Sequence, residues 1–187
     1  NSSTLELKKL DKSFENLKKI QNVFLNCFFN SPNTKNLFKE LTSNEETDFS
    51  RYNYFHASYT VSLGKTDEAK KIIQSSLKRH PRNLLLNQYK NDLKDSKNLN
   101  TFNCKKENNV VAEILYITAN ALSSQKIYHL SNFYLNLAKY LNEDFHSFEI
   151  LFAENFYKIE NFEKAKKIYK DLDKKGEAFK WHSTKQL

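Results

Sequence analysis

The side chains that could catalyse a reaction or bind a metal ion are scattered singly along this sequence. The five histidines are His56, His80, His129, His146 and His182. A zinc site of the HExxH type needs two histidines one helical turn apart, so that both reach the same ion. That spacing does not occur here, and the sequence predicts no metal site. His56 lies beside Ala57, where we expect a partly buried, hydrogen-bonded ring that serves packing.

Nucleotide chemistry and acid–base catalysis are also poorly supported by the residues present. The only glycines are Gly64 and Gly176, too few for a loop whose adjacent backbone amides cradle phosphate. The neighbouring carboxylates Glu143 and Asp144 fall where a helix end is expected, and helix capping or solvation is their usual role there. The sequence therefore predicts a protein that is not an enzyme and that uses no cofactor.

The two cysteines, Cys27 and Cys104, stand far apart and belong to no CxxC or Cys/His ligand pattern. We interpret them as two free thiols. Free thiols are typical of a reducing compartment, which favours the cytoplasm.

The elements that must position any functional side chain are predicted to be helices. A chain of 187 residues with 39% hydrophobic content can bury a core, and two glycines with two prolines leave few residues for hairpin turns. The longest apolar cluster, 23–29, is interrupted by Asn26 and is far shorter than the roughly 20 residues of a membrane-spanning helix. The sequence predicts an all-α fold.

Small residues recur at a fixed spacing along the chain, which indicates an internal repeat. Within three successive units the two small residues are 12 positions apart, as in the pairs Ala57 and Ala69, Ala119 and Ser131, and Ala153 and Ala165. The last two pairs are also 34 positions apart from each other. Two antiparallel helices approach closely only where small side chains meet at their crossing. We therefore expect each pair to mark a helix crossing.

The segment 50–83 shows how one unit is built. Gly64 can adopt the left-handed conformation that ends a helix, and Thr66 or Asp67 can cap the next helix. Pro81 then ends the second helix after Arg79.

This segment, with its small residues, its Leu63–Ala69 turn and its terminal Pro81, resembles the tetratricopeptide repeat family. The stretch from Val111 to Leu187, which contains the run Asn136–Leu141, resembles repeat proteins of alphaproteobacteria with AT-rich genomes. The resemblance covers 50–83 and 112–179. It implies a right-handed superhelical solenoid of antiparallel helix pairs, which serves as a protein-binding scaffold.

The chain divides into three parts on this reading. Residues 1–49 hold a long amphipathic helix and a short helix near 34–41, which cap the solenoid or cover its groove. Residues 50–111 hold one repeat unit, a helix over 84–94 and a long loop or degenerate helix over 95–109. Residues 112–187 hold two units and the first helix of a further repeat, so we expect a fragment of a longer protein in which Trp181 packs on the next repeat.

The resemblance also implies a concave groove lined by the first helix of each unit, which would bind a peptide or a partner helix. Tyrosine rings and amides suit an extended peptide. The implied groove residues are Arg51, Tyr54, Ser58 and Val61 from the first unit, Glu113, Tyr116, Asn120 and Ser124 from the second, and Ile150, Glu154, Tyr157 and Lys158 from the third.

The distribution of charge supports an alternative partner. The formal net charge is +8, and residues 50–111 alone hold twelve basic against five acidic side chains, a balance of +7. A basic patch of this kind attracts RNA or another polyanion. Lysine spread over every solvated helix face would give the same composition, and neither the oligomeric state nor the identity of the partner follows from it.

Overall fold

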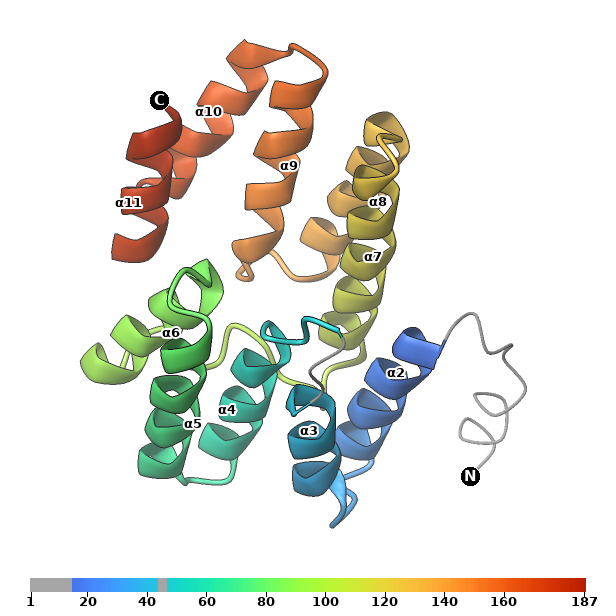
Figure 1. The fold of residues 1–187 in the computed structure, drawn as a ribbon, viewed down its shortest axis with the longest axis vertical. Helices are drawn as coiled ribbons and strands as arrows, with labels where there is room; N and C mark the ends of the chain where they lie inside the picture. Colours follow the sequence, from blue (N-terminus) through green and yellow to red (C-terminus); the bar gives the residue numbers. More distant parts are fainter. Residues whose placement is uncertain (1–14, 44–46) are drawn as a thin grey trace.

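The computed structural model describes residues 15–43 and 47–187, and in this part of the chain it contains ten helices and no strand (Figure 1). The predicted all-α fold is confirmed. No helix in the described ranges is long and apolar enough to cross a membrane. The helices are α2 (Glu15–Phe28), α3 (Thr34–Thr42), α4 (Tyr52–Ser62), α5 (Thr66–Arg79), α6 (Leu84–Asp95), α7 (Glu107–Ser124), α8 (Tyr128–Leu141), α9 (Ser147–Lys158), α10 (Phe162–Leu172) and α11 (Glu177–Gln186).

The predicted helix crossings occur at the small residues. Helices α4 and α5, α7 and α8, and α9 and α10 pack together as consecutive pairs. All six small residues of these pairs are buried. In the second pair the Ser131 hydroxyl also donates a hydrogen bond of 2.7 Å to the backbone carbonyl oxygen of Ala119. A serine is therefore tolerated at this crossing because its one polar group is satisfied by the facing helix.

The turn between α4 and α5 follows the prediction in part. Gly64 has a φ of 75°, the left-handed conformation expected after the end of a helix, and α5 ends at Arg79, two residues before Pro81. The predicted cap is wrong. The residue before the first helical turn is Lys65, and Thr66 already lies inside α5, so neither Thr66 nor Asp67 caps it.

The parts of the chain outside the three helix pairs also compare well with the prediction where the structure describes them. Helix α6 matches the expected helix over 84–94, and α3 matches the short helix near 34–41. The segment 96–106 contains no helix, so the long-loop interpretation of this region holds. The first half of the predicted N-terminal helix, residues 1–14, lies outside the described residues.

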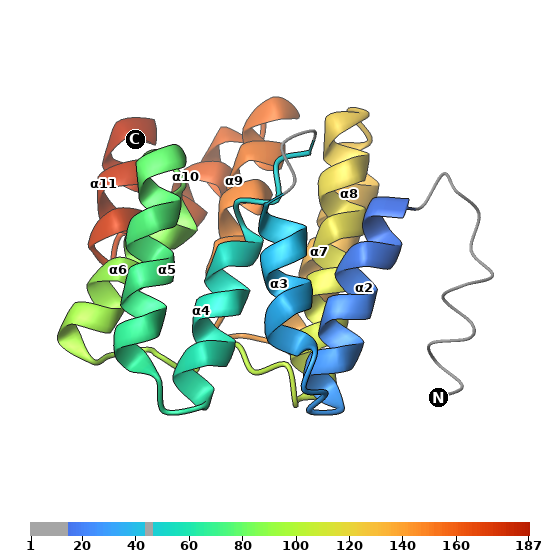
Figure 2. The same cartoon turned by 60° about the horizontal axis from the view of Figure 1, so that its bottom comes forward.

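The ten helices form two rows that face each other, α2–α6 and α7–α11. Figure 2 shows the first row standing in front of the second, and Figure 1 shows α6 beside α11 and α2 beside α7. The segment 96–106 runs between the rows. Aromatic rings from both rows meet there: Phe55 lies 4.5 Å from Phe102, and Tyr54 lies 5.3 Å from Phe145, measured between ring centroids.

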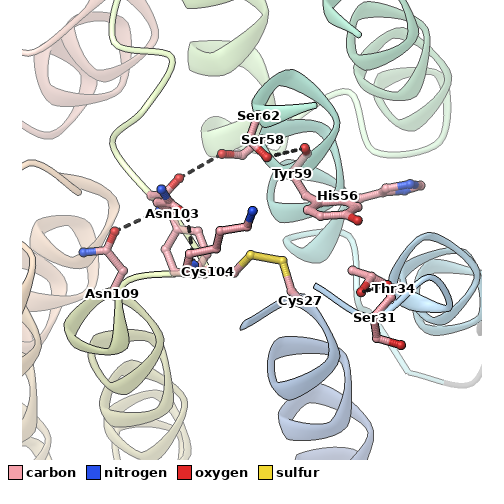
Figure 3. The surroundings of a disulfide bond; sticks show 12 residues. Cys27, Ser31, Thr34, His56, Ser58, Tyr59, Ser62, Asn103, Cys104 and Asn109 are labelled. Atoms are coloured by element: carbon pink, nitrogen blue, oxygen red, sulfur yellow. Dashed lines mark hydrogen bonds between the residues drawn. A yellow bond between two sulfur atoms is a disulfide. The ribbon is translucent and has the colours of Figure 1, made fainter. Parts of the chain in front are cut away.

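Cys27 and Cys104 form a disulfide, so the expectation of two free thiols is wrong (Figure 3). The bridge joins the last turn of α2 to the segment 96–106, and both side chains are buried. A separation of 77 residues gives no local signal for the pairing. The partners become neighbours only because the segment 96–106 crosses back toward the N-terminal helices.

Candidate partner-binding cleft

The residues predicted to line an open groove divide into three groups in the structure. In the first group, Arg51, Glu113 and Tyr116 contact one another at the interface of the two rows. Arg51 donates from Nε and Nη2 to the two carboxylate oxygens of Glu113 at 2.7 and 2.8 Å, and from Nη2 to the Ser147 hydroxyl at 3.0 Å. The guanidinium carbon lies 4.0 Å from the Tyr116 ring centroid. This bidentate pair ties α4 to α7 and α9.

Burial controls the electrostatics of this ion pair. The Glu113 side chain is fully buried, and burial raises the pKa of its carboxyl group, while the Arg51 charge opposes that rise. Burial would by itself lower the pKa of Arg51, but the neighbouring Glu113 carboxylate raises it above its usual value. The two-point geometry fits an ionised pair. Glu113 has no exposed surface and cannot contact a partner in the structure described, whereas Arg51 and Tyr116 are partly exposed.

The second group, Tyr54 and Ser58, is covered by the segment 96–106. The Tyr54 hydroxyl lies 2.8 Å from the Thr101 hydroxyl oxygen, and the Ser58 hydroxyl donates to the carbonyl oxygen of Phe102 at 3.0 Å. Both side chains are buried. The segment therefore occupies much of the face that an open groove would present, which the sequence pattern of a single repeat cannot indicate.

The third group remains exposed on the C-terminal halves of α7 and α9. It consists of Asn120, Ser124, Glu154, Tyr157 and Lys158.

The two helices of this third group are linked through a polar network around Asn155, which is fully buried. Its amide oxygen accepts from the Ser123 hydroxyl at 2.6 Å, and its amide nitrogen donates to Ser131 and to Asn132 on α8. The network therefore joins α7 to α9 next to the exposed residues Ser124 and Glu154. Val61 on α4 and Ile150 on α9 are half-buried in the core.

A cleft of about 510 Å³ opens where the two rows meet at α6 and α11. Ligand pockets in proteins have volumes of a few hundred to about 1,000 Å³. Its walls come from α6, the segment 96–101, the turn 144–147 before α9, and the start of α11. Its lining includes four aromatic rings, Tyr54, Tyr89, Phe145 and Phe179.

Polar groups on α6 shape one wall of the cleft. The Gln88 side chain donates to the Asp92 carboxylate at 2.9 Å and accepts a hydrogen bond from the backbone amide of Ala178 at 3.1 Å. Burial raises the pKa of Asp92 to about 6. Within residues 15–43 and 47–187, no lysine, arginine or histidine forms an ion pair with Asp92. The cleft therefore holds a carboxylate that is available to a ligand's amide or cationic group.

The contact between α6 and α11 depends on a glycine. Gly176 has a φ of 142°, and a Cβ placed on it would lie 2.3 Å from the Gln88 amide nitrogen. Glycine leaves space here for the end of the Gln88 side chain, and its φ lies in a region that other residues rarely adopt. The contact between Gly176 and Gln88 spans 88 residues and has no local signal in the sequence.

Two further residues, His56 and Trp181, bear on the predictions made from sequence. His56 is buried, and its ring stacks on Phe38 at 5.4 Å, which confirms the packing role; its Nε2 makes no hydrogen bond to any described residue. Trp181 is 61% exposed, with the Lys185 ammonium 3.9 Å from its ring centroid.

Comparisons of this chain with protein-family models, with curated proteins and with solved structures found no match. The function must therefore be argued from the geometry of the chain alone.

Proposed function

We propose that this protein is a non-catalytic scaffold that binds a peptide segment of a protein partner in the cleft between α6 and α11. In this proposal the pairs α4–α5, α7–α8 and α9–α10 belong to a short right-handed solenoid of the tetratricopeptide type. The two rows of helices close over its concave side. Support comes from the three pairs that cross at small residues with one internal spacing. The closed concave side then leaves the cleft as the place where a ligand can enter.

The observation that carries the proposal is the composition of the cleft wall. Four buried aromatic rings form a rigid apolar floor beneath the cleft, while the exposed side chains of Asn98 and Asn100 bring amides that can pair with the backbone of an extended peptide. Asp92 adds a negative charge in a chain of net charge +8. A peptide with a lysine or arginine fits this wall better than an acidic one.

The exposed residues at the ends of α7 and α9 provide a second contact surface on the same proposal. Tyr157 is 56% exposed and lies against Phe162 with 5.3 Å between ring centroids. Glu154 lies about one helical turn before Tyr157 on α9, and Lys158 follows it directly. This surface is what remains open of the groove predicted from sequence.

A peptide-display selection against the whole chain tests the proposal. Peptides selected on the wild-type protein are measured by fluorescence polarisation against Asn100→Trp, which places an indole in the cleft, and against Asn36→Trp, which places one on the exposed face of α3. We expect the cleft variant to weaken binding by about tenfold or more and the α3 variant to leave it unchanged. Selected peptides that bind both variants equally would show that the cleft is not the site.

A second function, binding of a polyanion, is favoured by a hollow between α5 and α6. This hollow, of about 360 Å³, is lined by Lys70, Lys90 and Lys94 around the apolar side chains of Ile73 and Leu93. Three ammonium groups around one depression attract phosphate or another anion.

The dependence of binding on salt distinguishes the two functions. Counterion release predicts that affinity for a single-stranded RNA falls steeply as salt rises, and that Lys90→Gln with Lys94→Gln makes the dependence less steep. Peptide binding in the cleft predicts a shallow dependence and no effect of the two glutamines. An RNA affinity that does not change with salt would exclude the polyanion reading.

A further inference from the structure

Helix α8 presents a row of large apolar side chains to solvent. Leu130 is 44% exposed, Phe133 56%, Leu137 38% and Tyr140 78%. The opposite face of α8 is the one that packs on α7, through buried residues such as Ser131, Leu135 and Ala138. We call the four exposed side chains the α8 stripe. A single exposed leucine is ordinary on a protein surface, but a contiguous row of four marks an interaction site.

The spacing within the stripe is the spacing of a helix–helix seam. Its members follow one another at intervals of three, four and three residues. This is the alternation of a and d positions in a heptad, which puts every side chain on one narrow face of the helix. The four residues cover most of the length of α8, so a second helix could lie along them over nearly three turns.

The charge of α8 indicates what kind of surface the stripe can meet. The helix has 14 residues and one formally charged side chain, Lys139, which forms an ion pair with Glu149. At the chain's average of 28% charged residues, a helix of this length would carry about four. Two copies of a chain with net charge +8 repel each other where their basic faces meet. The uncharged face of α8 avoids this repulsion.

We propose that the α8 stripe is a self-association surface, at which α8 of one copy packs on α8 of a second copy. A two-fold dimer brings the same patch of both copies together, so the patch must complement itself. An apolar, uncharged helix face meets that requirement, whereas a charged face would oppose its own copy. Four side chains make a smaller patch than the roughly 20 to 30 residues per partner of a standard interface, which places the dimer in the weaker, reversible class.

The position of α8 keeps the dimer compatible with the cleft. Helix α8 lies at the opposite side of the molecule from α6 and α11 (Figure 1), and none of the stripe residues lines the cleft. A dimer built on α8 leaves both clefts open and presents two of them in one assembly. The inference does not depend on what the cleft binds.

Sedimentation velocity of the full chain over a range of micromolar to near-millimolar concentrations tests the proposal. The wild-type protein is expected to shift from 22.1 kDa toward twice that mass as concentration rises. Phe133→Glu places a charge in the seam and is expected to weaken association roughly a hundredfold. Phe162→Glu is the matched control, because Phe162 is a phenylalanine of nearly equal exposure, 54%, that begins α10 outside the stripe.

Each outcome decides the proposal, with circular dichroism used to verify that the variants keep their helices. Association of the wild type and of Phe162→Glu, with a monomeric Phe133→Glu, supports it. A wild type that stays monomeric overturns it and leaves the stripe to another occupant. Association that survives Phe133→Glu, or that both glutamate variants abolish, also overturns it, because the contact then does not depend on the α8 stripe specifically.

Discussion

At the scale of single residues, the ion pair between Arg51 and Glu113 links the two rows of helices. Removing two charges from water is costly, and a bidentate pair offsets that cost only while both partners are present. The Ser147 hydroxyl and the Tyr116 ring complete the surroundings of the guanidinium. This predicts a strong asymmetry between single and double substitutions.

We expect Arg51→Met to lower the free energy of unfolding by roughly 3 to 5 kcal/mol, because it leaves the Glu113 carboxylate buried without a counter-charge. The double variant Arg51→Met with Glu113→Leu replaces both charges by apolar groups of similar size and is expected to recover most of that loss. Urea denaturation of both variants measures the difference. Equal destabilisation by the single and double variants would mean that the two side chains are not coupled.

Asp92 gives a prediction about pH. Burial raises its pKa from 3.8 to about 6, so the folded state binds the proton more tightly than the unfolded state. The stabilising contribution of this proton is complete below 3.8 and is lost as pH rises through about 6. Asp92→Asn cannot ionise, and after allowance for partial solvent screening it should gain roughly 1 kcal/mol at neutral pH. Thermal melts in acid should show no such gain, and a gain of equal size in acid would contradict the assignment.

The family resemblance implies some of the residues that meet between the two rows of helices. Arg51, Glu113 and Tyr116 were singled out because they occupy equivalent faces of first helices, and the structure does bring these three together. Their role could not be predicted, since a repeat pattern specifies the packing within a unit and says nothing about a later unit folding back over an earlier one. Asp92, Gln88 and Phe179 were missed for the same reason.

At the scale of helices, the crossings at small residues are the feature that sequence predicts best. A crossing needs small side chains at a fixed spacing on two nearby helices, and both conditions are local in the chain. The pairing of α6 with α11 needs instead that Gly176 and Gln88 meet across the molecule. Local sequence patterns therefore predict which consecutive helices pair. How the pairs are arranged depends on contacts between residues far apart in the sequence, which such patterns do not show.

A bulky residue at a crossing should cost far more stability than a change on the exposed face of the same helix. Ala153→Phe has no space at the α9–α10 crossing and is expected to lower the free energy of unfolding by about 1 to 3 kcal/mol or more. Lys158→Ala removes an exposed side chain and should change it by less than about 0.5 kcal/mol. Equal melting temperatures of these two variants would show that α9 and α10 do not cross at Ala153.

At the scale of the whole molecule, the disulfide and the segment 96–106 hold the N-terminal helices to the centre. The segment is bonded to α4 through Ser58, to the end of α8 through the Asn142 amide, which donates to the Thr101 carbonyl oxygen, and to α7 through Asn109. Cys104 adds a covalent tie to α2. The segment that sequence composition suggests as a loop therefore contributes Phe102 and Cys104 to the core.

Loss of the disulfide should destabilise the chain substantially. In the chain-entropy account, a link across 77 residues restricts the unfolded state by about 4 kcal/mol. The variant Cys27→Ser with Cys104→Ser is expected to unfold at lower denaturant by a corresponding amount, and reductant should shift the wild type in the same direction. Disulfides persist in oxidising compartments, so we expect both thiols to be resistant to alkylation in protein taken from its native compartment. Wild-type stability that is insensitive to reductant would contradict the bridge.

Nuclear Overhauser effects measured on the whole chain determine whether the two rows of helices close over each other in solution. The structure predicts cross-peaks between the ring protons of Tyr54 and Phe145, and between the Gln88 side chain and the Ala178 backbone amide. An assigned spectrum that shows the contacts within the α4–α5 and α9–α10 pairs but neither of these two would mean that the two rows do not close over each other.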